Sequence, residues 1–123
     1  MSAPVLPSPS TPTVLTRAVL RAAEHLGLRN RELALILGAS EASISRLNAS
    51  RRIDPASKEG ELALLFLRLF RSLDALVGGS DAAARAWLHA PNDHLGGVPA
   101  ERIRLAEGLV DVVQYLDAMR GRL

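Results

Sequence analysis

Apolar residues recur at three- and four-residue intervals along most of this chain, and almost no segment alternates apolar and polar residues as a half-buried strand does. Val14, Ala18, Ala22 and Leu26 illustrate the pattern, which places side chains on one face of a helix. A chain of 123 residues, 48% of them hydrophobic, is long enough to bury a core between such helices. We therefore predict an all-α fold.

Helix-capping residues divide the first half of the chain into three helices. Gly27 is expected to end a first helix, Asn30 is a suitable N-cap for a second, and Gly38 suits the left-handed residue that closes it. Ser40 is a suitable N-cap for a third helix.

The second half is expected to contain a long helix and shorter helical stretches. Asp54-Pro55 is predicted to open the long helix, as an N-cap followed by proline in the first turn, and Gly78-Gly79 to end it. Ser80 is suited to cap the next helix. Pro99 is expected to start a last helical stretch with a break at Gly108.

Residues 30–47 have the pattern of a helix-turn-helix. Ala34 is small enough for two helices to cross closely, Gly38 follows four positions later at the turn, and Ile44 follows six positions after that. Residues 17–58 also hold eight arginines and lysines against four acidic residues, whereas residues 59–123 hold seven against nine. The basic half is the half expected to meet phosphate, and an ordinary helical hairpin is the alternative.

The third helix would then be the recognition helix. Arg46 is the one outward residue there that is able to make a bidentate contact to guanine, and Arg51 and Arg52 are placed to contact phosphates. The predicted DNA-binding residues are Ser40, Ser43, Ser45, Arg46, Asn48, Arg51 and Arg52.

Enzyme chemistry finds little support in the sequence. The chain has no cysteine, so it offers no disulfide, no thiolate metal site and no thiol nucleophile. His89 and His94 flank a turn near Asp93, but a metal site needs three or four ligands in fixed geometry. No glycine-rich phosphate loop follows a strand, and no nucleophile has an evident base. We expect no enzyme activity, cofactor or metal.

Residues 1–13 are expected to form a flexible tail rich in proline and serine, because they lack the basic start and apolar core of a secretory signal. The longest strongly apolar run, residues 62–67, is far shorter than the ~20 residues that span a membrane. We expect a soluble, cytoplasmic protein.

The C-terminal half holds, in order, Trp87-Leu88, Pro91-Asn92, Gly96-Gly97, Pro99 and Gly108-Leu109. This block resembles the toxin-binding domain of the Xre/MbcA/ParS antitoxin family. The helix-turn-helix precedes this block, as in that family, so the similarity covers roughly residues 15–123.

This resemblance implies a domain order and a function. It implies an Xre-like helix-turn-helix domain over residues 14–56, followed by a small helical toxin-binding and dimerisation domain over residues 57–123. The implied partner is a RES-type toxin that degrades NAD, and antitoxins of this type neutralise it by direct binding and repress their own operon. A free-standing regulator whose C-terminal half dimerises or senses a ligand is the alternative.

The predicted toxin-binding residues are Trp87, Asn92, Leu95, Arg120, Gly121, Arg122 and Leu123. Trp87 is the sole tryptophan and is also expected to be a packing anchor that needs a partner for its indole N–H. In the family the C-terminal end reaches the toxin's active site. The carboxylate of Leu123 is an anion that arginines in an NAD pocket could bind.

We also predict a homodimer. The long helix, residues 57–77, is apolar over too much of its circumference to face one core, and helix-turn-helix proteins commonly bind palindromic DNA as two-fold dimers. This helix, with the last one, is the expected interface.

Overall fold

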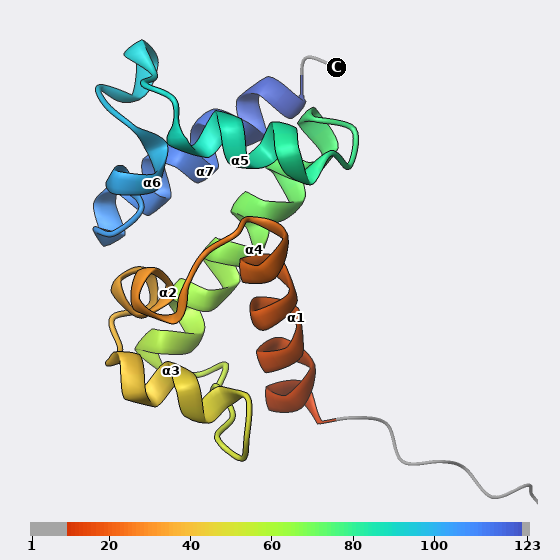
Figure 1. Ribbon diagram of the computed structural model, residues 1–123, viewed down its shortest axis with the longest axis vertical. Helices are drawn as coiled ribbons and strands as arrows, with labels where there is room; N and C mark the ends of the chain where they lie inside the picture. The colour runs from red at the N-terminus through yellow and green to blue at the C-terminus, as the bar shows by residue number, and fades with distance from the viewer. Residues whose placement is uncertain (1–9, 122–123) are drawn as a thin grey trace, which may run out of the picture.

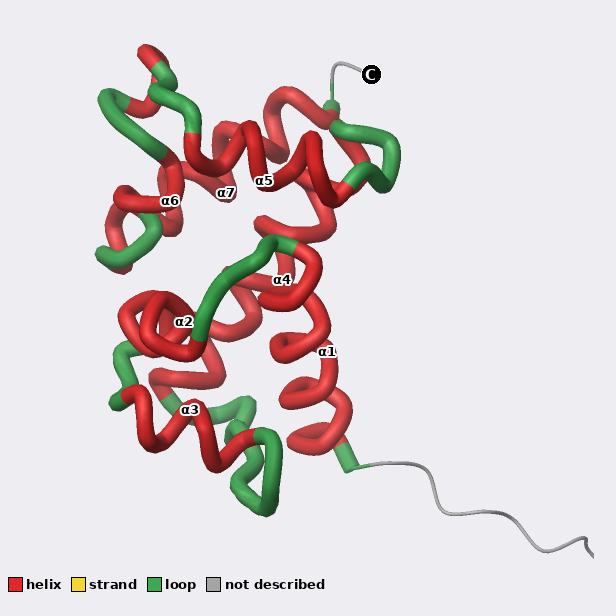
Figure 2. The backbone as a smooth tube through the Cα atoms, in the orientation of Figure 1, coloured by secondary structure: helices red, strands yellow, loops and turns green. Residues whose placement is uncertain are grey.

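The computed structural model describes residues 10–121, which form helices and loops without a strand (Figures 1 and 2). The elements in chain order are α1 (Thr11–His25), α2 (Asn30–Leu37), α3 (Glu41–Leu47), α4 (Lys58–Leu76), α5 (Asp81–His89), the 3-10 helix η1 (Asp93–Leu95), α6 (Pro99–Arg102) and α7 (Ala106–Arg120). The predicted all-α fold is confirmed. No helix in this range is long and apolar enough to cross a membrane.

Helix α4 is the central element of the fold. In Figure 1, α1, α2 and α3 surround its first part, whereas α5, α6 and α7 lie at its far end. It packs against α1, α2, α5 and α7, most extensively against α7. Its inward residues, such as Ala63, Phe66, Leu69 and Leu73, are completely excluded from solvent.

Other helices of the same chain thus cover most of the broad apolar surface of α4. Leu64, 52% exposed, is the one large hydrophobic residue of this helix that stays exposed. A second copy of the chain is therefore not needed to cover the apolar surface of α4.

The first helix begins earlier than predicted. Ser10 accepts a hydrogen bond from the Thr13 N–H as N-cap, and Pro12 occupies the first turn, where its missing N–H has no cost. Residues 11–13, which were expected to belong to a flexible tail, are therefore helical. The remainder of that expected tail, residues 1–9, lies outside the described residues.

The start of α4 was also predicted at the wrong place. The Asp54 carbonyl accepts hydrogen bonds from the Ser57 N–H and from its hydroxyl, which makes Asp54-Pro55 a turn before the helix. Ser57 is the N-cap, and it accepts a 3.0 Å bond from the Gly60 N–H.

The last helical stretch is interrupted at Ile103–Leu105 and not at Gly108. Gly108 lies in the first turn of α7, directly against the backbone of Arg102, where a Cβ atom would stand 1.9 Å from the Arg102 carbonyl oxygen. The glycine therefore permits a close approach of α7 to the end of α6 and does not break the helix.

Candidate functional site

The turn between α2 and α3 has the geometry of a helix-turn-helix. Ala34 is 5% exposed at the helix crossing, Gly38 has φ +67°, and its N–H donates to the Ala34 carbonyl. Ser40 caps α3 by accepting a 3.1 Å hydrogen bond from the Ser43 N–H. Ile44, a residue of α3, is completely buried. The predicted roles of Gly38 and Ser40 in the local fold are confirmed, whereas α2 is capped by Arg29, one residue before the expected Asn30.

The outer face of α3 presents most of the residues predicted to bind DNA. Ser45, Arg46 and Asn48 are exposed, and Ser43 is half-buried. Ser40 is also exposed, but its hydroxyl is engaged in the helix cap. Arg46 forms no ion pair among the described residues, which leaves its guanidinium available for a ligand.

Arg51 is held within the fold. Its Nε donates to the Ser43 carbonyl at 2.9 Å, and its two terminal nitrogens donate to the two carboxylate oxygens of Glu59 at 2.7 and 2.9 Å. The hydrogen bond to Glu59 raises the pKa of Arg51. Arg52 is more exposed and donates to the backbone carbonyls of Leu47 and Arg51.

Two arginines that were not predicted to bind DNA lie beside this face. Arg17 and Arg21, one turn apart on α1, line a depression of about 450 Å³ together with Asn30 and Asn48. Their i, i+4 spacing on the first helix was visible in the sequence, but their proximity to the end of α3 depends on how the helices pack.

The loop after α5 is built around Asn92. The Asn92 side chain accepts a hydrogen bond from the Leu95 N–H and so caps η1, and the Asn92 N–H donates to the Gly97 carbonyl at 2.9 Å. Gly96 has φ +67°, which explains the glycine at this reversal. Leu95, predicted to contact a toxin, is only 8% exposed and its side chain packs into the core. Burial of this loop's one leucine stabilises the reversal.

Three aromatic rings, one each from α5, η1 and α7, form a row. Trp87 stacks on Tyr115 with ring centroids 6.3 Å apart, and Tyr115 stacks on His94 at 5.8 Å. Trp87 is half-buried and packs against the core, as expected of a packing anchor. We call these three residues the aromatic row.

Polar residues adjoin the aromatic row. Arg102 donates to Asp111 at 2.7 Å, and both line a depression of about 370 Å³ with Gln114 and Tyr115. Sequence reasoning missed this group. Tyr115 is the sole tyrosine of a chain that is 3% aromatic, and that rarity was the available signal.

The predicted residues at the end of the chain are described in part. Arg120 ends α7 and is exposed, and Gly121 follows it. Arg122 and Leu123 lie outside the described residues. In Figure 1 the loop between α5 and α6 lies on the other side of the C-terminal half from the end of α7. That loop holds Asn92 and Leu95, and Arg120 is the last residue of α7, so the structure does not bring all the predicted toxin-binding residues together.

Comparisons with known proteins cover nearly the complete chain. Residues 8–68 match the family described as the antitoxin Xre-like helix-turn-helix domain, and residues 72–122 match the antitoxin Xre/MbcA/ParS C-terminal toxin-binding domain. A chain in the crystal structure of the M. tuberculosis MbcT-MbcA toxin-antitoxin complex is 27% identical, with a TM-score of 0.68. That match covers 89% of this chain and 96% of the other. No curated protein matches the chain.

Proposed function

Because the chain belongs to the Xre/MbcA/ParS antitoxins, we propose that it neutralises a RES-type, NAD-degrading toxin by direct binding and represses its own operon through α2 and α3. The observation that carries the proposal is the order of the two matches along one chain, a helix-turn-helix domain followed by a toxin-binding domain. The similar chain of known structure belongs to a toxin-antitoxin complex. Both DNA and such a toxin are cytoplasmic partners, and we expect the protein to act there.

The proposed neutralisation is tested with the reading frame next to this gene, which we expect to encode the toxin. Co-expression of this chain should restore growth of cells that express the toxin, and the purified toxin should hydrolyse NAD until this chain is added. Complex formation without any effect on NAD would contradict the RES assignment but not the antitoxin function. Absence of a complex would contradict both and favour a free-standing regulator.

We propose that the aromatic row and the segment that follows α7 contact the toxin. Trp87 is half-buried and large, a combination that is common at the energetic centre of an interface. Deletion of Gly121–Leu123 should leave the helices intact, because Arg120 is exposed and α7 is anchored earlier by Leu116. The truncated chain should still bind DNA but should lose neutralisation. Full protection by the truncated chain would place the inhibitory contact elsewhere.

We propose that Arg46 reads a base and that Arg52 contacts phosphate. Arg46→Ala should lower the preference for the operator at one base position, by roughly 1–3 kcal/mol if the contact is bidentate. Arg52→Ala should weaken binding equally on operator and random duplexes and reduce the salt dependence. Equal losses on both duplexes for Arg46→Ala would contradict its role as a reader. Arg51 stays a predicted phosphate contact, but its substitution would also disturb the fold.

We further propose that the protein acts as a homodimer on DNA. The support is the two-fold symmetry with which helix-turn-helix proteins occupy palindromic sites. The expected interface on α4 loses its support, since this helix is covered by its own chain. A monomer in sedimentation experiments at micromolar concentration and above, with and without operator DNA, would contradict the dimer.

A further inference from the structure

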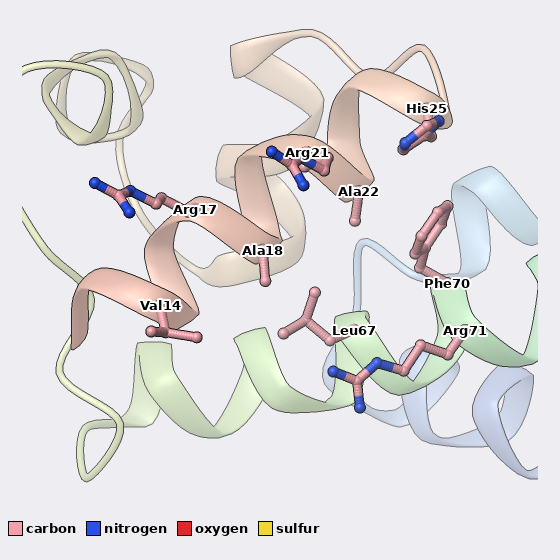
Figure 3. A pocket seen from close by; sticks show the side chains of 9 residues that line it. All are labelled: Val14, Arg17, Ala18, Arg21, Ala22, His25, Leu67, Phe70 and Arg71. Carbon is pink, nitrogen blue, oxygen red and sulfur yellow. The ribbon is translucent and has the colours of Figure 1, made fainter. Parts of the chain in front are cut away.

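A groove to which the proposed function assigns no role lies between α1 and α4 (Figure 3). Its floor is apolar and is formed by Val14, Ala18 and Ala22 of α1 with Leu67 and Phe70 of α4. Its volume is about 450 Å³. We call this feature the α1–α4 groove. Val14 is 51% exposed at its edge, so the apolar floor continues to the surface.

The rim of the groove is positively charged. Arg17 and Arg21 come from α1 and Arg71 from α4, and none of the three forms an ion pair with another described residue. His25, which stacks on Phe70 at 5.4 Å and is hydrogen-bonded to Asp81, closes one end. An adjoining depression shares Leu67 and Arg71 and adds Leu64, Arg68 and Arg120. Within that depression, Arg68 is already paired with Asp117.

From this charge and shape we infer that the α1–α4 groove binds an acidic, amphipathic helical segment of another protein. Apolar side chains of that helix would enter the groove at i, i+3 and i+4 spacing, and its acidic residues would pair with Arg17, Arg21 and Arg71. A helix fits better than an extended peptide because it satisfies its own backbone hydrogen bonds, and the two groove helices offer no sheet edge. From Val14 to His25 the groove runs along roughly 16 Å of α1, which corresponds to about three helical turns.

A second copy of this chain fits the groove poorly. In a two-fold dimer the same patch faces itself, so Arg17, Arg21 and Arg71 of the two copies would come together. Like charges across an interface disfavour association. The groove residues also precede residue 72, where the toxin-binding match begins. The inference therefore adds a protein-binding surface in the DNA-binding half and does not depend on which toxin is bound.

The probe for this inference is a labelled synthetic peptide of about three helical turns, with leucines along one face and glutamates on the others. A peptide in which lysines replace the glutamates controls for nonspecific apolar binding. Fluorescence anisotropy with the full chain should show binding of the glutamate peptide alone, and binding should weaken as salt is raised.

A pair of double variants locates the site. Val14→Asp with Arg71→Glu changes two surface residues of the groove, and Leu105→Asp with Arg104→Glu changes an exposed leucine and arginine outside it. The groove variant should bind the peptide at least tenfold more weakly than the unmodified chain, whereas the control should bind within about twofold of it. Circular dichroism of both variants checks that the helices persist.

Several results would overturn the inference. They are equal binding of the two peptides, equal losses in the two double variants, or displacement of the peptide by random duplex DNA. Conversion of a homodimer to a monomer by the groove variant alone would identify the groove as a self-interface, and the inference would then be wrong.

Discussion

Arg51 joins α3 to the start of α4. Its guanidinium donates to the Ser43 carbonyl and to both carboxylate oxygens of Glu59, and the two side chains are only 25% and 18% exposed. Bidentate pairs of this kind are among the stronger polar contacts in proteins. Because the pKa of Arg51 is raised, deprotonation of its guanidinium removes this contribution only in strong alkali, as the pH rises through that pKa.

Arg51→Ala is therefore expected to lower the free energy of unfolding by about 1.5–3 kcal/mol, because it leaves Glu59 without its partner. Urea unfolding followed by far-UV circular dichroism measures this change. Arg52→Ala, whose side chain is exposed, is the matched control and should stay within about 0.5 kcal/mol of the unmodified chain. Equal effects of the two substitutions would show that the Arg51–Glu59 pair adds no stability.

Two buried glycines stand where no side chain fits. A Cβ atom at Gly108 would lie 1.9 Å from the Arg102 carbonyl oxygen, and one at Gly60 would lie 2.1 Å from the Asp54 carbonyl oxygen. Each substitution by alanine should destabilise the fold by about 1–3 kcal/mol or more, because a backbone segment has to move. Gly97, which has open space at its Cβ position, is the control and should tolerate alanine. Thermal unfolding distinguishes the three variants, and an unchanged midpoint for Gly108→Ala would contradict the close approach.

At the level of the helices, sequence reasoning succeeded where one residue decides a helix end. Gly38, Ser40 and Ser80 were assigned correctly, since a left-handed residue or a capping hydroxyl acts within a few positions. It failed at Asp54-Pro55, where two capping residues, Asp54 and Ser57, compete within four positions. The turn packs closely against Gly60, and this contact is not visible in the local sequence pattern.

The candidate sites were predictable to a smaller extent. The outward face of α3, with Arg46, follows from helical periodicity, and the structure keeps that residue exposed. The engagement of Arg51 by Glu59, the burial of Leu95 and the α1–α4 groove depend on how distant helices pack, and no local pattern reveals them.

The cap of α5 provides a test of a single helix end. Ser80 accepts a 3.1 Å hydrogen bond from the Ala83 N–H, and Ser80 is exposed. Ser80→Ala should cost about 1 kcal/mol of stability, whereas Ser80→Asp should cost little, because aspartate caps equally well and interacts favourably with the helix dipole. Chemical unfolding of the two variants measures the difference. Identical midpoints would show that this cap is dispensable.

The seven described α-helices are expected to unfold together. Helix α4 packs on α1 and α2 of one half and on α5 and α7 of the other. Ser72, buried in α4, donates to Asp117 of α7 at 2.8 Å. Arg85 of α5 donates to the carbonyls of Glu24 and His25 at the end of α1. Neither half can lose its structure without exposing one side of α4.

Tryptophan fluorescence reports on the C-terminal half through Trp87, and far-UV circular dichroism reports on all helices. The two signals should give coincident denaturation curves, as a two-state transition requires. Two separated transitions would mean that the halves fold independently. If the halves folded independently, a chain truncated after residue 71 would be stable on its own. We expect this truncated chain to be largely unfolded.

The shared helix also limits how this protein can be recombined. The two family matches meet between residues 68 and 72, in the interior of α4. A chimera joined there would pair the helix-turn-helix half of one relative with the toxin-binding half of another, and it would mix two sets of core residues along a single helix. The two halves can therefore be exchanged between relatives only if α4 and the surfaces that pack on it are exchanged as one block.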